Sequence, residues 1–241
     1  MPRAGVLAFG FFLAATIALA QSPIEEAQRL IASYHEDLSR LDRARDLMEK
    51  SLKTDSQVEG MILLARIYFM WGDVRARNDE EKLATYDRGG QVGKRAVELA
   101  PKNPEAHFWY AVNIARWGQS KGVLRSLFLL PALREEVDTI LSLSPEHPGA
   151  LGLAGNVELA LPWGDLDKAD GYFQKGLKID PHNTAVRLDF ARLLIKRAKY
   201  EEARKELQRV LNEKEPRYPA DWTVKHTRRA KEILESIKGK T

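Results

Sequence analysis

A proline-centred phrase recurs three times in this chain of 241 residues, and it constrains the fold more than any other feature. The copies are "ELAPKNPEAHFWYA", "SLSPEHPGALGLAG" and "KIDPHNTAVRLDFA", which align on Pro101, Pro145 and Pro181. Proline cannot continue a helix, but it fits the first turn of the next one. Each phrase therefore predicts a helix end, a tight turn and a new helix, and its recurrence indicates a repeat protein.

The segments between these turns have apolar residues at helical spacing. "DKADGYFQKGLKIDP" places Ala169, Phe173 and Leu177 on one stripe, and "EEARKELQRVLNEKEP" does the same with Ala203 and Leu207. The chain therefore reads as helix pairs of about 34 residues each. We also expect a first pair within residues 24–53 and a basic C-terminal helix over residues 222–238.

These segments resemble tetratricopeptide (TPR) repeats. The clearest unit carries the pattern of small residue, alanine, aromatic, small residue and proline at Gly155, Ala169, Phe173, Gly176 and Pro181. The resemblance implies an all-α superhelix of TPR-like helix pairs over residues 21–241. Extra residues around "RNDEEKLATYDRG" and "GQSKGVLRSLFLLP" are predicted to be inserted segments.

A narrower resemblance rests on "HFWYAVNIARWGQSKG" followed by "LALPWGDLDKADGYFQKGLKIDP". This combination is similar to the TPR-like T-component of TRAP transporters and to the helical domain of the regulator-of-microtubule-dynamics family. The first resemblance implies a periplasmic scaffold that accompanies a substrate-binding protein and can hold an apolar ligand. The chain departs from many such lipoproteins because it has no cysteine to lipidate.

Residues 1–20, "MPRAGVLAFGFFLAATIALA", have the form of a secretory signal peptide. Arg3 gives the positive start, and Ala18-Leu19-Ala20 forms the cleavage pattern. We expect a mature chain from Gln21 that is periplasmic or secreted and has no membrane span, although retention of the segment as an anchor stays open. The absence of cysteine excludes disulfides and cysteine-based chemistry.

The formal net charge of +4 is too mild to predict a nucleic-acid partner. Residues 192–241 nevertheless carry 15 Lys and Arg against 8 Asp and Glu. This basic end either meets an anionic partner or is an ordinary solvated helix surface.

Two motifs imitate catalytic sites, and neither has the required context. "GQSKG" places Ser120 in the pattern of a hydrolase nucleophile, but a helix and not a strand is expected before it. We expect Gly118 to cap that helix. "GGQVGK" lacks essential residues of a phosphate loop and reads as a flexible helix entry. The five histidines show no metal-ligand spacing, so we predict no enzyme activity, no metal and no cofactor.

Two further features of the sequence each allow two interpretations. "VLRSLFLLPAL", broken by Pro131, is either a short inserted helix that covers the core or a lip or docking patch. Asn113 shares a helix face with Trp109, and its amide is expected to make either an interhelix bond or a ligand contact.

The TPR resemblance implies a concave groove lined by the first helix of each pair. The predicted groove residues are Phe69, Phe108, Val112, Asn113, Arg116, Asn156, Leu159, Arg192 and Lys196. An apolar floor edged by Arg116, Arg192 and Lys196 suits an acidic peptide or an amphipathic carboxylate. We therefore expect a scaffold that binds a protein or peptide partner. The alternative is a binder of a small apolar ligand, held beneath the inserted segment.

Overall fold

The computed structural model describes residues 22–241, so the predicted signal segment lies outside the described residues. Within this range the regular structure is helical, and no strand occurs. Five helix pairs are α1 (Pro23–Ala32) with α2 (Ser39–Ser51), α3 (Val58–Val74) with α4 (Asp79–Leu99), α5 (Pro104–Lys121) with α6 (Val123–Leu143), α7 (Pro148–Ala160) with α8 (Leu166–Ile179), and α9 (Thr184–Lys196) with α10 (Tyr200–Leu211). The C-terminal segment continues through α11 (Pro219–Asp221), the π-helix η1 (Trp222–His226) and α12 (Thr227–Ser236).

The three proline phrases are the turns between pairs, as predicted. In each phrase the residue two places after the aligned proline caps the next helix. Asn103 and Asn183 accept backbone N–H groups through their side-chain oxygens, and His147 accepts the N–H of Ala150 through Nδ1. These caps satisfy N–H groups that a helix start leaves without partners. Pro104 and Pro148 occupy the first turns of α5 and α7.

The small residues of the repeat pattern lie where helices approach closely. Ala111, Ala169, Ala191 and Ala203 are fully buried. At Gly155, a Cβ atom would lie 2.6 Å from the Phe173 ring, so glycine is what lets this ring fill the space between α7 and α8. The small residues of the repeat pattern therefore mark the positions where neighbouring helices pack closely.

The glycines of "GGQVGK" correct one prediction, because they do not form a flexible entry into a helix. Gly89, Gly90 and Gly93 lie within the continuous helix α4 and are buried. A Cβ at Gly93 would lie 2.8 Å from the Cα of Tyr110 in α5. Their absent side chains allow the backbones of α4 and α5 to approach closely.

The predicted inserted segment also differs from expectation. It is not a separate short helix, because α6 runs without interruption from Val123 through Pro131 to Leu143. Gly118 is not a helix cap either: it is buried inside α5, where a Cβ would meet the Leu129 side chain at 2.7 Å. The turn falls instead at Gly122, whose φ of +100° suits glycine.

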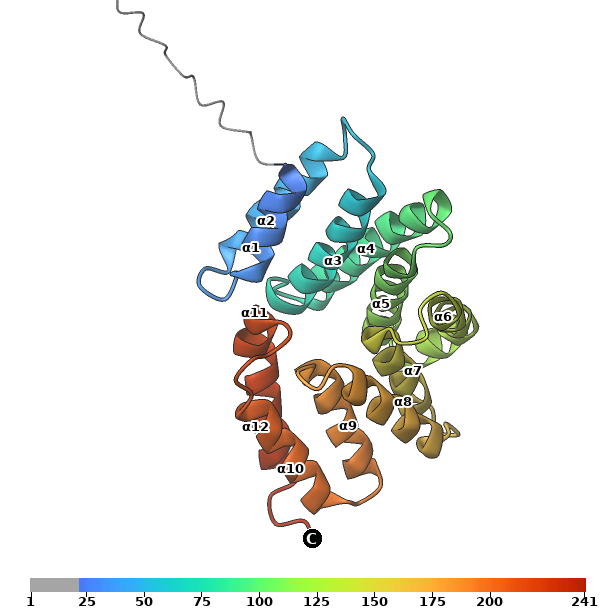
Figure 1. Ribbon diagram of the computed structural model, residues 1–241, viewed down its shortest axis with the longest axis vertical. Helices are drawn as coiled ribbons and strands as arrows, with labels where there is room; N and C mark the ends of the chain where they lie inside the picture. The colour runs from blue at the N-terminus through green and yellow to red at the C-terminus, as the bar shows by residue number, and fades with distance from the viewer. Residues whose placement is uncertain (1–21) are drawn as a thin grey trace, which may run out of the picture.

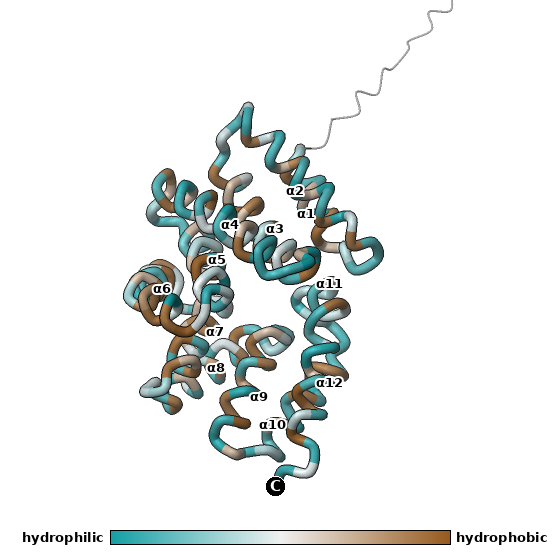
Figure 2. Tube along the Cα trace, turned by 180° about the vertical axis from the view of Figure 1, so that it is seen from behind, coloured by the Kyte–Doolittle hydropathy of each residue, from teal (hydrophilic) through white to brown (hydrophobic). Residues whose placement is uncertain are grey.

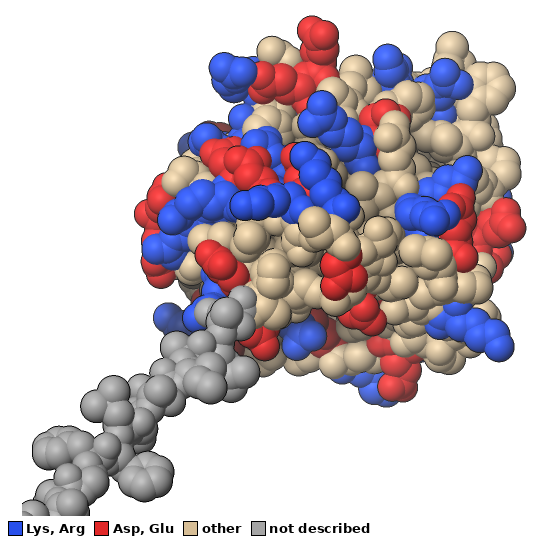
Figure 3. Space-filling view, turned by 90° about the horizontal axis from the view of Figure 1, so that it is seen from above, with Lys and Arg blue, Asp and Glu red and all other residues tan. Residues whose placement is uncertain are grey.

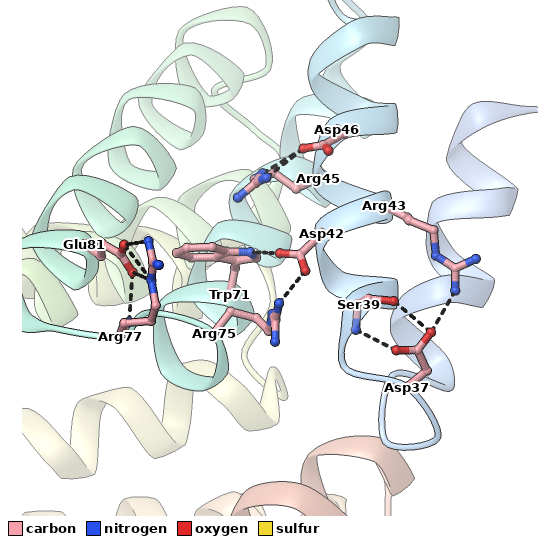
Figure 4. Close-up of polar contacts among 10 residues, drawn as sticks. All are labelled: Asp37, Ser39, Asp42, Arg43, Arg45, Asp46, Trp71, Arg75, Arg77 and Glu81. Atoms are coloured by element: carbon pink, nitrogen blue, oxygen red, sulfur yellow. Dashed lines mark hydrogen bonds and ion pairs between the residues drawn. The ribbon is translucent and has the colours of Figure 1, made fainter.

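Polar contacts join the first two pairs across α2 and α3 (Figure 4). Asp42 of α2 accepts hydrogen bonds from Trp71 Nε1 at 2.6 Å and from Arg75 at 2.7 Å. The Arg45 guanidinium lies 5.0 Å from the centre of the Trp71 ring. These contacts fix the angle between the pairs at the edge of a core that contains Leu41, Ala44 and Met48.

The array bends until its C-terminal segment reaches the N-terminal helices (Figure 1). Helix α11 contacts α1, and Ala220 is part of the core cluster formed by α1, α2 and α3. At its other end, α12 packs Ala230 and Ile233 against α10. Residues 218–236 therefore link the last pair to the first.

Charge is mixed on the face that the N-terminal helices present in Figure 3, where basic and acidic side chains lie side by side. Arg40–Glu36, Arg43–Asp37 and Arg45–Asp46 are ion pairs of this region. Such a surface offers no broad area of one sign to a polyanion.

Candidate binding face

The first helices of the pairs contact one another in succession: α3 meets α5, α5 meets α7, α7 meets α9, and α9 meets η1. In Figure 1, α5, α7 and α9 lie toward the middle of the molecule, whereas α6 lies at its rim. We call the surface that α3, α5, α7, α9 and η1 turn toward the middle the inner face.

Aromatic rings and cations occupy the inner face at α3 and α5. The rings of Phe69 and Trp109 lie 5.7 Å apart. Arg116 lies 5.5 Å from the Phe69 ring centre, and Lys225 of η1 approaches the same ring to 4.9 Å. Phe69 is half-buried and packs between two cations, an arrangement worth about 0.5–1 kcal/mol per contact at exposed sites and more when desolvated.

A group of four charged side chains, three of them largely buried, lies beside this ring. We call it the closure cluster, and it consists of Asp73, Arg116, Asp221 and Lys225. Lys225 Nζ lies 2.8 Å from Asp221 and 3.2 Å from Asp73, and Arg116 lies 3.6 Å from Asp73. The cluster joins α3 and α5 to residues far along the chain.

Two tyrosines complete the cluster by donating to its carboxylates. Tyr34 donates to Asp221 at 2.8 Å, and Tyr86 donates to Asp73 at 2.7 Å. Burial, reinforced by the neighbouring carboxylates, raises the pKa of both phenols. Both tyrosines therefore stay protonated and act as hydrogen-bond donors.

The charged forms persist in the cluster although burial opposes them. Burial alone would raise the pKa of Asp73, but Arg116 and Lys225 hold it below its usual value. Likewise, Lys225 outweighs the burial of Asp221, and both aspartates raise the pKa of Lys225 above its ordinary value. Two acids and two cations thus compensate one another, which a buried ionic group requires.

His226 follows Lys225 on η1, and unlike the cluster residues it is uncharged at neutral pH. Burial lowers its pKa to about 4, although Asp221 and Asp189 act in the opposite direction. Its Nδ1 is 2.7 Å from the hydroxyl of Thr184 on α9. A neutral imidazole therefore bridges η1 to α9.

The inner face is more open along α7 and α9. Asn156 of α7 donates to Asp189 of α9 at 2.6 Å. Asp189 also pairs with Arg192 at 3.2 Å, and the Arg192 side chain is 51% exposed. Arg116, at 44%, is the exposed member of the closure cluster. These two arginines present cations to whatever enters this part of the face.

Several predicted groove residues make contacts within the fold. Leu159 is buried in a core cluster with Ala169 and Phe173. Lys196 Nζ lies 2.8 Å from the carbonyl oxygen of Leu159 and so satisfies the C-terminal end of α7. Phe108 packs edge-on against Trp109 and contacts His147 at the next turn. Val112 is half-buried on α5.

Asn113 adopts the first of its two expected roles, the interhelix bond. Its side chain is fully buried, and its amide donates to the Ala65 carbonyl of α3 at 3.0 Å and to the Trp109 carbonyl at 2.8 Å. The side chain ties α5 to α3 beneath the inner face.

Sequence reasoning missed Asp73, Asp221 and Lys225. Asp73 follows Phe69 by one helical turn, which places it on the same face and was the available signal. Lys225 lies in the segment predicted as a basic helix, and Asp221 comes directly before that segment. No sequence pattern pairs either residue with α1 or α3. Their roles come from the closure of the array.

The motifs that imitate catalytic sites have local structural contacts. The Ser120 hydroxyl donates to the Arg116 carbonyl oxygen within α5. His107 lies 2.6 Å from Glu136, and His182 lies 3.0 Å from Glu213. Across residues 22–241, no group of three or more metal-ligating side chains is assembled.

Comparison with known proteins agrees with this architecture. Residues 163–220 match the tetratricopeptide repeat family model. A crystal structure of a thermophilic TPR protein from Thermus thermophilus superimposes with a TM-score of 0.65, at 20% identity, over 86% of this chain and 99% of that one. The fold therefore defines a TPR-type scaffold, a class that binds other proteins.

The family is more specific. Residues 23–161, more than half of the chain, match the model "Regulator of microtubule dynamics protein 1-3". The chain belongs to this family, which is one of the two that the narrower resemblance named. It is 30% identical over 98 residues to regulator of microtubule dynamics protein 2 of Macaca fascicularis, and 24% identical over 126 residues to human regulator of microtubule dynamics protein 1. These alignments cover 37% and 45% of this chain, and 24% and 40% of the relatives.

Proposed function

We propose that this protein is an exported, non-catalytic scaffold that holds a protein or peptide partner on its inner face. The TPR fold supports protein interaction as the general role. The observation that carries the proposal is the exposed side chain of Arg192 on α9, which pairs with Asp189, a residue that also accepts from Asn156 of α7. Arg116 on α5 is a second exposed cation of the inner face. The relatives' name refers to microtubules, but the match covers only 24% of the length of the Macaca fascicularis relative, so the proposal does not extend to that partner.

The chemistry of this face favours an acidic segment. The Arg192–Asp189 pair is an exposed i, i+3 ion pair, and such pairs contribute roughly 0.2–1 kcal/mol. A carboxylate of a partner can therefore replace Asp189 at little cost. Arginine can bind that carboxylate through two parallel N–H donors, which adds directional selectivity.

The closure cluster limits where the partner binds. Next to α3, the inner face is covered by the chain's own C-terminal segment. Lys225 of η1 lies over the Phe69 ring and pairs with Asp73. A partner therefore binds along α5, α7 and α9. Export to the periplasm is part of the proposal and rests on the signal-like residues 1–20.

The alternative, a TRAP-associated carrier of an apolar ligand beneath the α6 segment, has less support. Two surface depressions, of about 490 Å³ and 320 Å³, lie on α1–α2 and on α2–α4. Both contain arginine and glutamate side chains in their walls, and neither is beneath α6.

Site-specific photocrosslinking tests the proposal. A photoreactive amino acid replaces Arg192, or Val112, the predicted groove residue one helical turn before Arg116 on α5. In a matched control it replaces the exposed Arg228 on α12. In the cell that makes the protein, we expect the same discrete partner band from both inner-face positions and not from position 228. Identical bands from all three positions, or none from the inner face, would contradict the proposal.

A further inference from the structure

Three large apolar side chains protrude from the start of α6. Val123, Leu124 and Phe128 are 74%, 75% and 78% exposed. They are adjacent on the first turns of the helix, just after the Gly122 turn that joins α5 to α6. Exposed apolar side chains that gather in one place commonly mark a surface that contacts a membrane or a protein partner.

These residues form the tip of a helix hairpin that is longer than the two pairs that follow it. Helices α5 and α6 contain 18 and 21 residues, whereas α7 to α10 contain 12 to 14. At 1.5 Å per residue, the difference extends the hairpin by roughly 6–10 Å. Figure 2 shows α6 at one edge of the molecule with a strongly hydrophobic stretch of its trace. The local core, which includes Leu129, Leu130 and Leu133, lies further along α6 and does not use the tip.

The surroundings of the tip are basic. Lys121 Nζ and the Arg125 guanidinium lie 5.8 Å and 5.4 Å from the Trp117 ring centre. Residues 106–134 include four basic side chains and no acidic one. Helix α7 brings Glu158 toward α6, and this carboxylate pairs with Arg134.

We propose that the α5–α6 tip inserts shallowly into the surface of an anionic lipid bilayer. Val123, Leu124 and Phe128 would enter the boundary between headgroups and acyl chains, the position that apolar residues of interfacial helices take. Lys121 and Arg125 would then lie at the level of the lipid phosphates, with Trp117 at the interface.

The geometry favours a membrane over a protein groove, because the apolar side chains form a protruding point whose flanks have one sign of charge. No helix within residues 22–241 is long and apolar enough to cross a bilayer, so the contact is peripheral.

Vesicle binding tests this inference directly. Residues 21–241 are mixed with vesicles of phosphatidylcholine alone or of phosphatidylcholine with phosphatidylglycerol, and binding is measured by co-sedimentation. We expect binding to the anionic vesicles that weakens as salt rises. The Leu124→Ser/Phe128→Ser double variant should bind about tenfold more weakly or worse, because it removes most of the inserted apolar surface. Both side chains are mostly exposed, so the fold should not change.

Two matched variants separate the contributions. Leu143→Ser, at the opposite end of α6, should leave binding unchanged. Lys121→Gln/Arg125→Gln should weaken binding to anionic vesicles and reduce its salt dependence. Because the chain has no native cysteine, a single cysteine at position 124 can carry a fluorophore whose emission shifts to the blue on insertion.

Failure of the wild-type chain to bind anionic vesicles overturns the inference. Binding that the Leu124→Ser/Phe128→Ser variant retains in full overturns it as well. A dimer that the same double variant abolishes, without any vesicle binding, would assign the tip to a second copy of the chain instead.

Discussion

At the scale of single residues, two repeats use the same buried polar contact. His107 and Arg187 each lie six residues after an aligned proline, and each contacts that proline's carbonyl oxygen. Each also reaches a glutamate on the second helix of its pair, Glu136 at 2.6 Å and Glu206 at 2.7 Å. These glutamates follow their prolines by 35 and 25 residues, a difference that matches the insertion in the earlier unit.

The Arg187–Glu206 contact predicts a large effect on stability. Glu206→Ala should lower the free energy of unfolding by about 3–5 kcal/mol, because it leaves the buried Arg187 guanidinium without its carboxylate. The control Glu202→Ala removes an exposed ion pair with Lys199 and should change the free energy of unfolding by less than about 0.5 kcal/mol. Urea unfolding followed by circular dichroism measures both. Equal effects from the two variants would show that the buried pair has no special role.

At the scale of helices, the turns were predictable and some helix boundaries were not. The proline phrases predict where pairs join because the cap and the proline act locally. In contrast, α6 passes through Pro131 and α4 contains Gly89, Gly90 and Gly93, because packing against α5 and α7 overrides local preference. A single sequence shows a proline or glycine, but it does not show the packed helix that allows this residue inside another helix.

The glycines of α4 and α8 give a matched test of this explanation. Gly93→Ala should destabilise the protein by about 1–3 kcal/mol, because its Cβ would lie 2.8 Å from the Tyr110 backbone. Gly171→Ala in α8 meets nothing within 4 Å and should stabilise it by about 0.5–1 kcal/mol through helix propensity. Thermal or urea denaturation measures both changes. Stabilisation by both substitutions would mean that α4 and α5 are less closely packed.

At the scale of the whole molecule, the main finding is that the array closes on itself. Lys225 contacts Asp73 across 152 residues of sequence, and Tyr34 contacts Asp221 across 187. Contacts of this range leave no local pattern, so the sequence predicted a basic C-terminal helix but not its docking. Closure also divides the predicted groove: Phe69 lies under the C-terminal segment, whereas Arg192 remains exposed.

Hydrogen exchange of residues 218–236, measured by mass spectrometry on wild type and Lys225→Met, tests closure most directly. In the wild-type protein, we expect this segment to be protected to a degree similar to α1 and α3. Lys225→Met leaves Asp73 and Asp221 without their shared cation, so the segment should lose about 3–5 kcal/mol of protection. Helices α7 and α8 should be unaffected. A C-terminal segment that exchanges like an unstructured tail in the wild type, or protection that survives Lys225→Met, would contradict the closed array.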